Sequence, residues 1–188
     1  IDDLDSDDLL TAFVDRVAAA GASRFSVHAR KAWLEGLDPK QNRTIPPLEH
    51  DRVKALKQRR PHLVIELNGG LESPEDCLEA LGHCDGAMVG RAAYAHPLRW
   101  GTMDSLVFGE PSRNVLASDV VMGLLPHAAA HLSRGGRLWD ICRHLVQLVE
   151  GVRGARHWRR ELGEKAQRSD ADLNVLEESG RQLKDAGL

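Results

Sequence analysis

The sequence predicts an α/β fold in its first half, followed by a helical region. Short apolar runs suited to strands alternate with helix-forming segments, and polar or glycine residues stand where each run ends. The predicted strands are residues 24–27, 63–67 and 86–89, ending at His28, Asn68-Gly69-Gly70 and Gly90-Arg91. Strand ends of this kind build the site at the C-terminal face of a TIM (β/α)₈ barrel. A barrel needs eight strands, so residues 1–100 are predicted to form only its C-terminal half.

Start and stop signals define the helices between these strands. Ser6 is a predicted N-cap, and the helix that it begins is predicted to run to Ala20, where Gly21 stops it. A second helix is predicted over residues 49–59, and Ser73 with the proline after it begins a third. Residues 29–48 form a long, polar and basic loop, and loops of that length in a compact domain are usually functional or disordered.

The pattern changes after residue 100. Residues 101–116 are predicted to be a linker, because glycine, proline and asparagine interrupt them. From residue 117 to residue 188, apolar residues recur with helical spacing and no strand pattern is present. Helices are predicted over residues 120–132, 138–163 and 172–184. The chain is therefore expected to hold a barrel part, a linker and a small all-helical domain.

The charge and cysteine content of the chain limit the kinds of partner and compartment to expect. The net charge of −3 excludes a chain that is cationic throughout, but basic residues predominate between residues 24 and 60, which favours an anionic partner. A solvated surface of mixed charge is the simpler alternative for any single lysine. The three cysteines form no CxxC pair, so a disulfide framework is not expected. This is consistent with a protein of the reducing cytoplasm. Neither a signal peptide nor a membrane-spanning segment is expected.

Two of the strand ends are typical of phosphate binding. Glycines after a strand let backbone N–H groups approach an anion without a Cβ in the way, and this applies to Asn68-Gly69-Gly70 and to Gly90. Arg91 adds a bidentate charged donor. His28 ends the preceding strand and can hydrogen-bond a flavin or a substrate carbonyl. The alternatives are ordinary turn glycines and a packed histidine bonded to the backbone.

A second set of cations suits a nucleic-acid backbone. Lys40 and Arg43 lie in the long loop, whereas Arg153, Arg156 and Arg159 are spaced to share one helix face. Exposed arginines on an ordinary helix are the alternative. Trp33, Trp139 and Trp158 are expected in the core rather than as base-stacking platforms. His127 and His131 are spaced i, i+4 without an HExxH pattern, so no metal is expected.

Several blocks of the sequence resemble the tRNA-dihydrouridine synthase family, in particular its A branch. The most specific block is His28-Ala29-Arg30-Lys31-Ala32-Trp33-Leu34, continued by Gly36-Leu37, Pro39-Lys40, Asn42-Arg43 and Ile45-Pro46-Pro47-Leu48. Asn68-Gly69-Gly70, Gly90-Arg91-Ala92-Ala93-Tyr94 and Gly154-Ala155-Arg156-His157-Trp158-Arg159-Arg160 follow in the order and at the spacing of the family. The resemblance covers essentially the whole chain.

The resemblance implies a flavoenzyme with a TIM barrel and a helical tRNA-binding domain. Its reaction is the reduction of a D-loop uridine of tRNA to 5,6-dihydrouridine, with FMN passing hydride from NADPH to the uracil ring. The position matching His28 contacts FMN, and the positions matching Asn68, Gly69, Gly70, Gly90 and Arg91 hold its phosphate. The positions matching Lys40, Arg43, Arg156 and Arg159 contact tRNA.

The chain departs from the family in what it lacks. The family's general acid is a cysteine in the first half of the barrel, and Cys77, Cys84 and Cys142 do not have that context. The flavin-binding residues that the family has in the first half of the barrel are also absent. So is the family's lysine-bearing segment, except that Ile1-Asp2-Asp3 resembles the end of it. The chain is therefore expected to be the C-terminal half of such an enzyme, with no catalytic acid of its own, and to be inactive without the missing half-barrel.

Two other interpretations remain open. The chain is alternatively a non-catalytic tRNA- or RNA-binding remnant, or one subunit of a split enzyme, in which the basic loop and the arginine face are the working parts. It is also compatible with a different FMN- or phosphate-binding barrel that acts on a small molecule. The arginine-rich helical region argues against that interpretation, because a small substrate needs no such surface.

Overall fold

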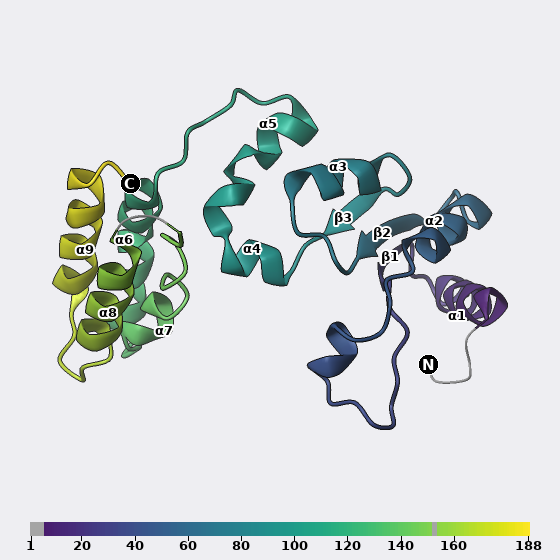
Figure 1. The fold of residues 1–188 in the computed structure, drawn as a ribbon, viewed down its shortest axis with the longest axis horizontal. Helices are drawn as coiled ribbons and strands as arrows, with labels where there is room; N and C mark the ends of the chain where they lie inside the picture. Colours follow the sequence, from purple (N-terminus) through teal and green to yellow (C-terminus); the bar gives the residue numbers. More distant parts are fainter. Residues whose placement is uncertain (1–5, 152–153) are drawn as a thin grey trace. The chain divides into compact units, whose positions relative to one another are not determined.

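The computed structural model describes residues 6–151 and 154–188 (Figure 1). The chain divides into two compact units, residues 1–90 and 91–188. The division falls at Gly90, two residues after the last strand, whereas the barrel part predicted from the sequence extends to residue 100. No described helix is long and apolar enough to cross a membrane.

The first unit contains a three-stranded parallel sheet in the order β1-β2-β3. Its strands are β1 (Arg24–His28), β2 (Val64–Asn68) and β3 (Gly86–Met88). Both pairs of neighbouring strands lie in parallel register, so that His28, Asn68 and Met88 are level at the C-terminal edge of the sheet. The three predicted strands are thus confirmed, and the structure adds that they are neighbours in chain order.

Helices precede each strand of this unit. They are α1 (Asp7–Ala19), α2 (His50–Arg59) and α3 (Pro74–Leu81), and the short helix η1 (Gln41–Arg43) lies in the long loop. Ser6 caps α1 by accepting a hydrogen bond from the Leu9 backbone N–H at 3.1 Å, as the sequence predicts. Ser73 and Asp76 form a complete capping box at the start of α3. These caps satisfy backbone donors that would otherwise lack partners and so set where each helix begins.

The two faces of the sheet differ in chemistry. Ile65 and Leu67 are almost completely buried, together with Val53 and Leu56 of α2. The other face carries alternate residues of the strands, as the two-residue period of a strand requires. On that face Glu66 accepts hydrogen bonds from Arg24 Nε at 2.6 Å and from Ser26 Oγ at 2.5 Å. These two bonds, Ser26 first, hold the pKa of the Glu66 carboxyl below its usual value. The face opposite the helices is therefore polar and internally paired.

Asp85, in the turn that precedes β3, hydrogen-bonds to the backbone of β2. Its Oδ2 atom accepts a hydrogen bond from the Ile65 backbone N–H at 2.8 Å and lies 2.7 Å from Lys57 Nζ of α2. The bond with Lys57, followed by that with the Ile65 N–H, lowers the pKa of the Asp85 carboxyl. Because the folded-state pKa is lowered, this stabilisation is present above the unfolded pKa of about 4 and is lost as the pH falls through the folded value.

We expect the substitution Asp85→Asn to loosen β2 locally. The carboxylate is partly exposed, so the loss of charge should lower the opening free energy by only about 1 kcal/mol, equivalent to about a fivefold faster exchange of the Ile65 amide. Hydrogen exchange followed by mass spectrometry at neutral pH measures this change. The difference between the wild type and the variant should shrink once the pH is low enough to protonate Asp85. A difference that persists at such a pH would contradict the assigned charge effect.

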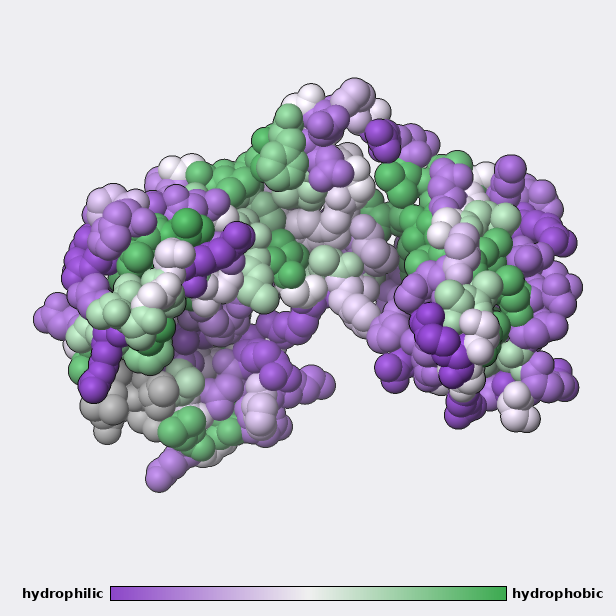
Figure 2. Space-filling view, turned by 180° about the vertical axis from the view of Figure 1, so that it is seen from behind, coloured by the Kyte–Doolittle hydropathy of each residue, from purple (hydrophilic) through white to green (hydrophobic). Residues whose placement is uncertain are grey.

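The second unit is helical. Its elements are α4 (Arg91–Ala95), η2 (Pro97–Thr102), α5 (Met103–Phe108), α6 (Ala117–Ser133), α7 (Trp139–Cys142), α8 (Ala155–Ala166) and α9 (Leu173–Asp185). Helix α9 packs against both α6 and α8, around a core that includes Val121, Leu162 and Leu176. In Figure 2 hydrophilic side chains border these helices and hydrophobic side chains show between them. The amphipathic spacing in the sequence therefore corresponds to one packed core.

One expectation for this unit needs correction. The single helix predicted over residues 138–163 is wrong, because α7 ends at Cys142 and α8 begins only at Ala155. Gly151 and Gly154 lie between them with φ of 76° and 96°, a left-handed conformation that a continuous helix cannot contain. Residues 101–116, the expected linker, contain α5, and residues 109–116 are without helix or strand.

Candidate functional site

The C-terminal edge of the sheet brings three strand ends together. His28 Nδ1 lies 2.7 Å from Asn68 Oδ1, and Asn68 Nδ2 donates to the Met88 carbonyl at 2.7 Å. Because the amide nitrogen is the donor in the second bond, the amide oxygen accepts in the first, and His28 carries a proton on Nδ1. Within residues 6–151 and 154–188, His28 Nε2 has no hydrogen-bond partner. The imidazole is thus oriented by Asn68 and has one nitrogen left for a ligand.

The two glycines after Asn68 form a tight loop against neighbouring side chains. Gly69 has φ of 105°, and a Cβ there would lie 3.1 Å from the His28 ring. Gly70 has φ of 71°, and a Cβ there would lie 2.3 Å from Leu48 Cδ1. Both positions therefore require glycine for the backbone conformation as well as for space. The sequence predicts that these glycines let an anion approach the backbone, and the groups that the structure shows at their Cβ positions are the side chains of His28 and Leu48.

The backbone of this edge offers several donors to an anion. Over the described ranges 6–151 and 154–188, the N–H groups of Gly69, Gly70 and Gly90 have no hydrogen-bond acceptor. Gly90 follows β3 by two residues, and a Cβ there would meet no atom within 4 Å. Arg91 comes next in the chain, is exposed and begins α4. Backbone N–H groups without an acceptor can bind a phosphate, so Gly69, Gly70 and Gly90 offer donors to one.

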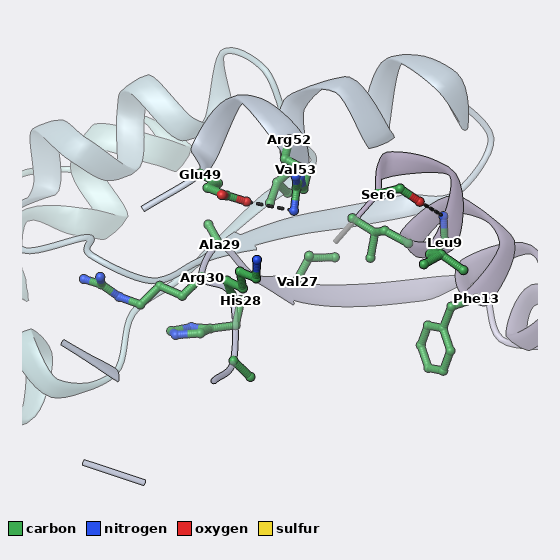
Figure 3. Close-up of a pocket in the computed structure, with 13 residues that line it drawn as sticks. Ser6, Leu9, Phe13, Val27, His28, Ala29, Arg30, Glu49, Arg52 and Val53 are labelled. Atoms are coloured by element: carbon green, nitrogen blue, oxygen red, sulfur yellow. Dashed lines mark hydrogen bonds and ion pairs between the residues drawn. The ribbon is translucent and has the colours of Figure 1, made fainter. Parts of the chain in front are cut away.

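A pocket of about 390 Å³ lies beside His28 and is lined by residues of α1, β1 and α2 (Figure 3). Leu9, Phe13 and Val27 supply apolar surface, and Phe13 is 65% exposed. His28 and Phe13 point to the same side of β1 in Figure 3, whereas Arg52 lies on the other side of that strand. The pocket thus combines an apolar wall with cationic groups, a combination that suits a flat anionic ligand.

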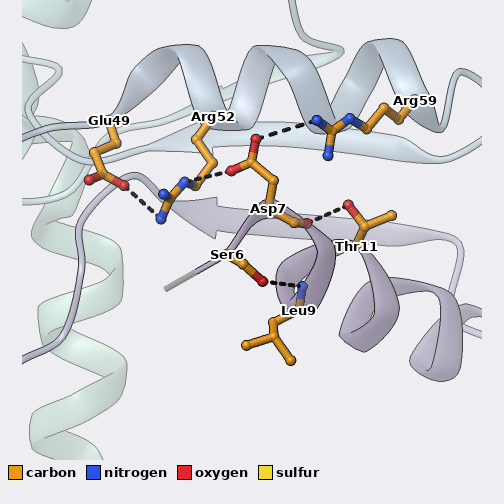
Figure 4. Close-up of polar contacts among 7 residues, drawn as sticks. All are labelled: Ser6, Asp7, Leu9, Thr11, Glu49, Arg52 and Arg59. Carbon is orange, nitrogen blue, oxygen red and sulfur yellow. Dashed lines mark hydrogen bonds and ion pairs between the residues drawn. The ribbon is translucent and has the colours of Figure 1, made fainter. Parts of the chain in front are cut away.

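Ion pairs fix the position of α1 against α2 at one side of this pocket (Figure 4). Arg52 Nε lies 2.9 Å from Asp7 Oδ1, and Arg52 Nη1 lies 2.9 Å from Glu49 Oε2. Arg59 Nη2 is 3.4 Å from the second oxygen of Asp7. Because Asp7 is in the first turn of α1, these pairs hold the start of that helix beside α2. Exposed pairs contribute little stability singly, so we interpret them as orienting the helices.

Side-chain hydrogen bonds close the long loop, residues 29–48. Asn42 accepts from the Trp33 backbone N–H at 2.8 Å and donates to the Trp33 carbonyl at 2.7 Å, which closes the loop on itself. Lys40 and Arg43 are exposed, at and beside η1, and neither lines the pocket at His28. The structure therefore presents both cations on the surface of the loop, separate from the strand-end cluster.

The arginines of α8 lie on its exposed side. Arg156 and Arg159 are exposed, whereas Trp158 and Leu162 of the same helix are buried. The Trp158 indole donates to the Leu145 carbonyl at 3.0 Å, which confirms this tryptophan as a core residue. Arg153 lies outside the described residues. The buried stripe of α8 thus fixes its two described arginines on the outer surface of the unit.

The cysteines are buried in the cores of the two units. Burial raises the pKa of the thiols of Cys77 and Cys84, and raises that of Cys142 to about 12. None of the three belongs to a strand end. In the described part of the chain, no three His, Cys, Asp or Glu side chains are grouped as metal ligands would be. His131 instead pairs with Asp140 at 3.1 Å.

Sequence reasoning missed one residue of the site. His50, the first residue of α2, places Nε2 2.7 Å from the carbonyl oxygen of Gly69. A histidine shortly after Pro46-Pro47 carries no recognisable signal in the sequence. Only the packing of α2 against β2 reveals that it reaches the glycine loop.

Known proteins resemble this chain throughout its length. The family model described as dihydrouridine synthase matches residues 1–185. The tRNA-dihydrouridine(20/20a) synthase of Shewanella oneidensis is 46% identical over 176 residues, which are 94% of this chain and 52% of that protein. The enzyme of the same name from Salmonella typhimurium is 45% identical over 180 residues, covering 95% of this chain and 54% of the relative. That from Escherichia coli K12 is 45% identical over 178 residues, covering 94% and 52%.

The chain spans about half the length of the curated relatives that it matches. The family match, in contrast, takes in almost every residue of this chain, including both units. The chain belongs to the dihydrouridine synthase family.

Proposed function

We propose that this chain is the C-terminal half of an FMN-dependent tRNA-dihydrouridine synthase, which reduces a D-loop uridine of tRNA in the cytoplasm with NADPH as reductant. The observation that carries the proposal is the cluster of unpaired N–H groups at Gly69 and Gly70 beside an oriented His28. Backbone donors for a phosphate, with an oriented imidazole at the same sheet edge, suit a flavin nucleotide. The names of the relatives supply the reaction.

In this proposal the first unit contributes the last strands of a TIM barrel. Residues 1–100 would be the barrel part, residues 101–116 the connection and residues 117–188 the tRNA-binding domain. Support comes from the parallel order β1-β2-β3 with a helix before each strand. The exposed Leu9 and Phe13 of α1 also support it, because apolar side chains beside an unpaired strand edge call for a covering segment.

The chain's residues would hold FMN as follows. Gly69, Gly70 and Gly90 donate backbone hydrogen bonds to the phosphate, Arg91 adds charge, and His28 meets the ring through Nε2. Asn68 keeps the His28 ring in place. When bound, FMN supplies the hydride that NADPH provides. The contribution of this half is binding and orientation, because its cysteines are buried and none stands at a strand end.

The tRNA would contact the exposed cations of both units. Lys40 and Arg43 lie on the surface of the long loop, and Arg156 and Arg159 on the outer side of α8. Lysine and arginine bind phosphate oxygens without reading sequence, so these residues would position the tRNA rather than select the uridine.

The test uses a joined protein, in which this chain is preceded by the part of the Shewanella oneidensis synthase that comes before its matched segment. The joined protein should bind FMN at least about tenfold more tightly than riboflavin, because riboflavin lacks the phosphate that the glycine loops would hold. Quenching of flavin fluorescence gives both dissociation constants. Equal affinity for the two flavins would reject the phosphate site.

We expect Gly70→Ala to weaken FMN binding in the joined protein by about tenfold. Two causes combine, namely the left-handed φ at Gly70, which costs alanine about 1 kcal/mol, and the overlap with Leu48 Cδ1. Adding Leu48→Ala should recover part of the affinity by removing the overlap. Gly36→Ala is the matched control, since Gly36 has φ of 84° but no atom within 4 Å of its Cβ position. Unchanged FMN affinity in Gly70→Ala would contradict the assigned role of this loop.

A non-catalytic tRNA-binding remnant, or a subunit of a split enzyme, is the second candidate. The burial of all three cysteines favours it, since no thiol of this chain is placed to protonate a substrate. The two candidates differ in flavin binding. A remnant should bind tRNA while the joined protein shows no preference for FMN over riboflavin.

A further inference from the structure

The orientation of one peptide decides whether the glycine loop can bind an anion. The carbonyl oxygen of Gly69 accepts a hydrogen bond from His50 Nε2 at 2.7 Å. A carbonyl has no proton to give, so Nε2 must be the protonated nitrogen. No peptide bond in the described part of the chain is cis. In a trans peptide the N–H points away from the C=O, so the Gly70 N–H points away from His50.

The opposite end of this peptide is the donor that the proposed site needs. Gly70 N–H is one of the groups without an acceptor in residues 6–151 and 154–188. Both residues that flank the peptide bond are glycines, so backbone sterics alone restrain its rotation weakly. A rotation that turned the N–H toward α2 would break the bond with His50. The histidine is therefore the group that keeps the donor facing outward.

The glycine loop that His50 contacts is also held at both of its ends. His50 is the first residue of α2 and is half-buried. Asp76, beyond the glycine loop, accepts the backbone N–H groups of Glu72 and Ser73 at 2.8 and 2.9 Å. The Glu72 bond is the main cause of the lowered pKa of the Asp76 carboxyl. The loop is thus held by His28 through Asn68 at one end, by Asp76 at the other, and by His50 between them.

We propose that His50 is a positioning residue for the phosphate site, holding the Gly69–Gly70 peptide so that its N–H faces the phosphate of FMN. The inference rests on the proposed function and adds to it a residue that touches neither the phosphate nor the ring. Its effect is confined to the phosphate end of the ligand. Loss of His50 should therefore weaken the binding of FMN and leave the binding of riboflavin unchanged.

The experiment compares four variants of the joined protein with the wild type by flavin fluorescence titration. His50→Leu removes the donor, His50→Asn keeps a donor too short to reach Gly69, and His50→Gln keeps one of suitable reach. His83→Leu is the control, because His83 is exposed at the end of α3. Thermal unfolding of each variant establishes that it is folded, and His50→Asn carries the test if His50→Leu does not fold.

We expect about a tenfold rise in the FMN dissociation constant for His50→Leu and His50→Asn, with riboflavin affected less than about twofold. His50→Gln and His83→Leu should resemble the wild type. Equal weakening of both flavins would show a general structural role and overturn the proposal, as would unchanged FMN affinity. A wild-type protein that does not prefer FMN would instead reject the phosphate site itself. The two failures are therefore distinguishable.

Discussion

Supplied with FMN, NADPH and unmodified tRNA, this chain alone is expected to produce no dihydrouridine, whereas the joined protein should produce it. The reduction of uracil needs a proton on the ring as well as hydride, and general acid catalysis contributes about 10²–10⁴-fold even when binding is intact. The buried thiol of Cys142, with its pKa raised to about 12, cannot serve a substrate in an open site. Nucleoside mass spectrometry of the digested tRNA measures the product.

The control for this prediction replaces the three cysteines of the chain, Cys77, Cys84 and Cys142, by alanine in the joined protein. Turnover should persist in any such variant that folds, because the acid would lie in the other half. Dihydrouridine formed by the chain alone would refute the claim that the acid is missing.

The unjoined chain should also self-associate, since α1 exposes Leu9 and Phe13 at 49% and 65% beside an edge strand. Light scattering tests that expectation.

The strand-end cluster was predictable because it depends on local rules. Short apolar runs indicated β1 and β2, and in a parallel sheet the C-terminal ends of neighbouring strands meet at one edge. His28 and Asn68 therefore had to lie close together once both strands were identified, and the structure shows them hydrogen-bonded. Ser6 and Ser73 were equally predictable, because capping needs only the side chain and the next three residues.

The contacts that the sequence did not reveal depend on tertiary packing. Leu48 reaches Gly70, and His50 reaches Gly69, across about twenty residues of chain that include a helix and a strand. No spacing rule links residues at such a separation. The break between α7 and α8 was missed for another reason, since apolar residues continue with helical spacing through the interruption while Gly151 and Gly154 leave the helix.

Charge reversal on α8 is expected to have the largest effect on tRNA. In the joined protein, the double substitution of Arg156 and Arg159 by Glu should lower tRNA affinity by about 100-fold at an ionic strength near 0.15 M, because each arginine is replaced by a repelling charge. Replacing both arginines by Gln instead should make the plot of the logarithm of the tRNA association constant against the logarithm of salt concentration less steep by about 1–2. Each phosphate that α8 no longer neutralises accounts for about one unit of slope. Filter binding or fluorescence anisotropy over a range of salt gives both quantities.

The matched control reverses two arginines of the same unit, Arg134 and Arg181, which are exposed at the end of α6 and on α9. Net charge then changes equally in both proteins, so a larger effect at Arg156 and Arg159 isolates the α8 surface from long-range attraction. Equal decreases in tRNA affinity in the two double variants would mean that only the net charge of the unit matters. FMN affinity should be unchanged in both, since α8 belongs to the second unit and the glycine loop to the first. A parallel decrease in FMN affinity would indicate unfolding rather than a local effect on tRNA binding.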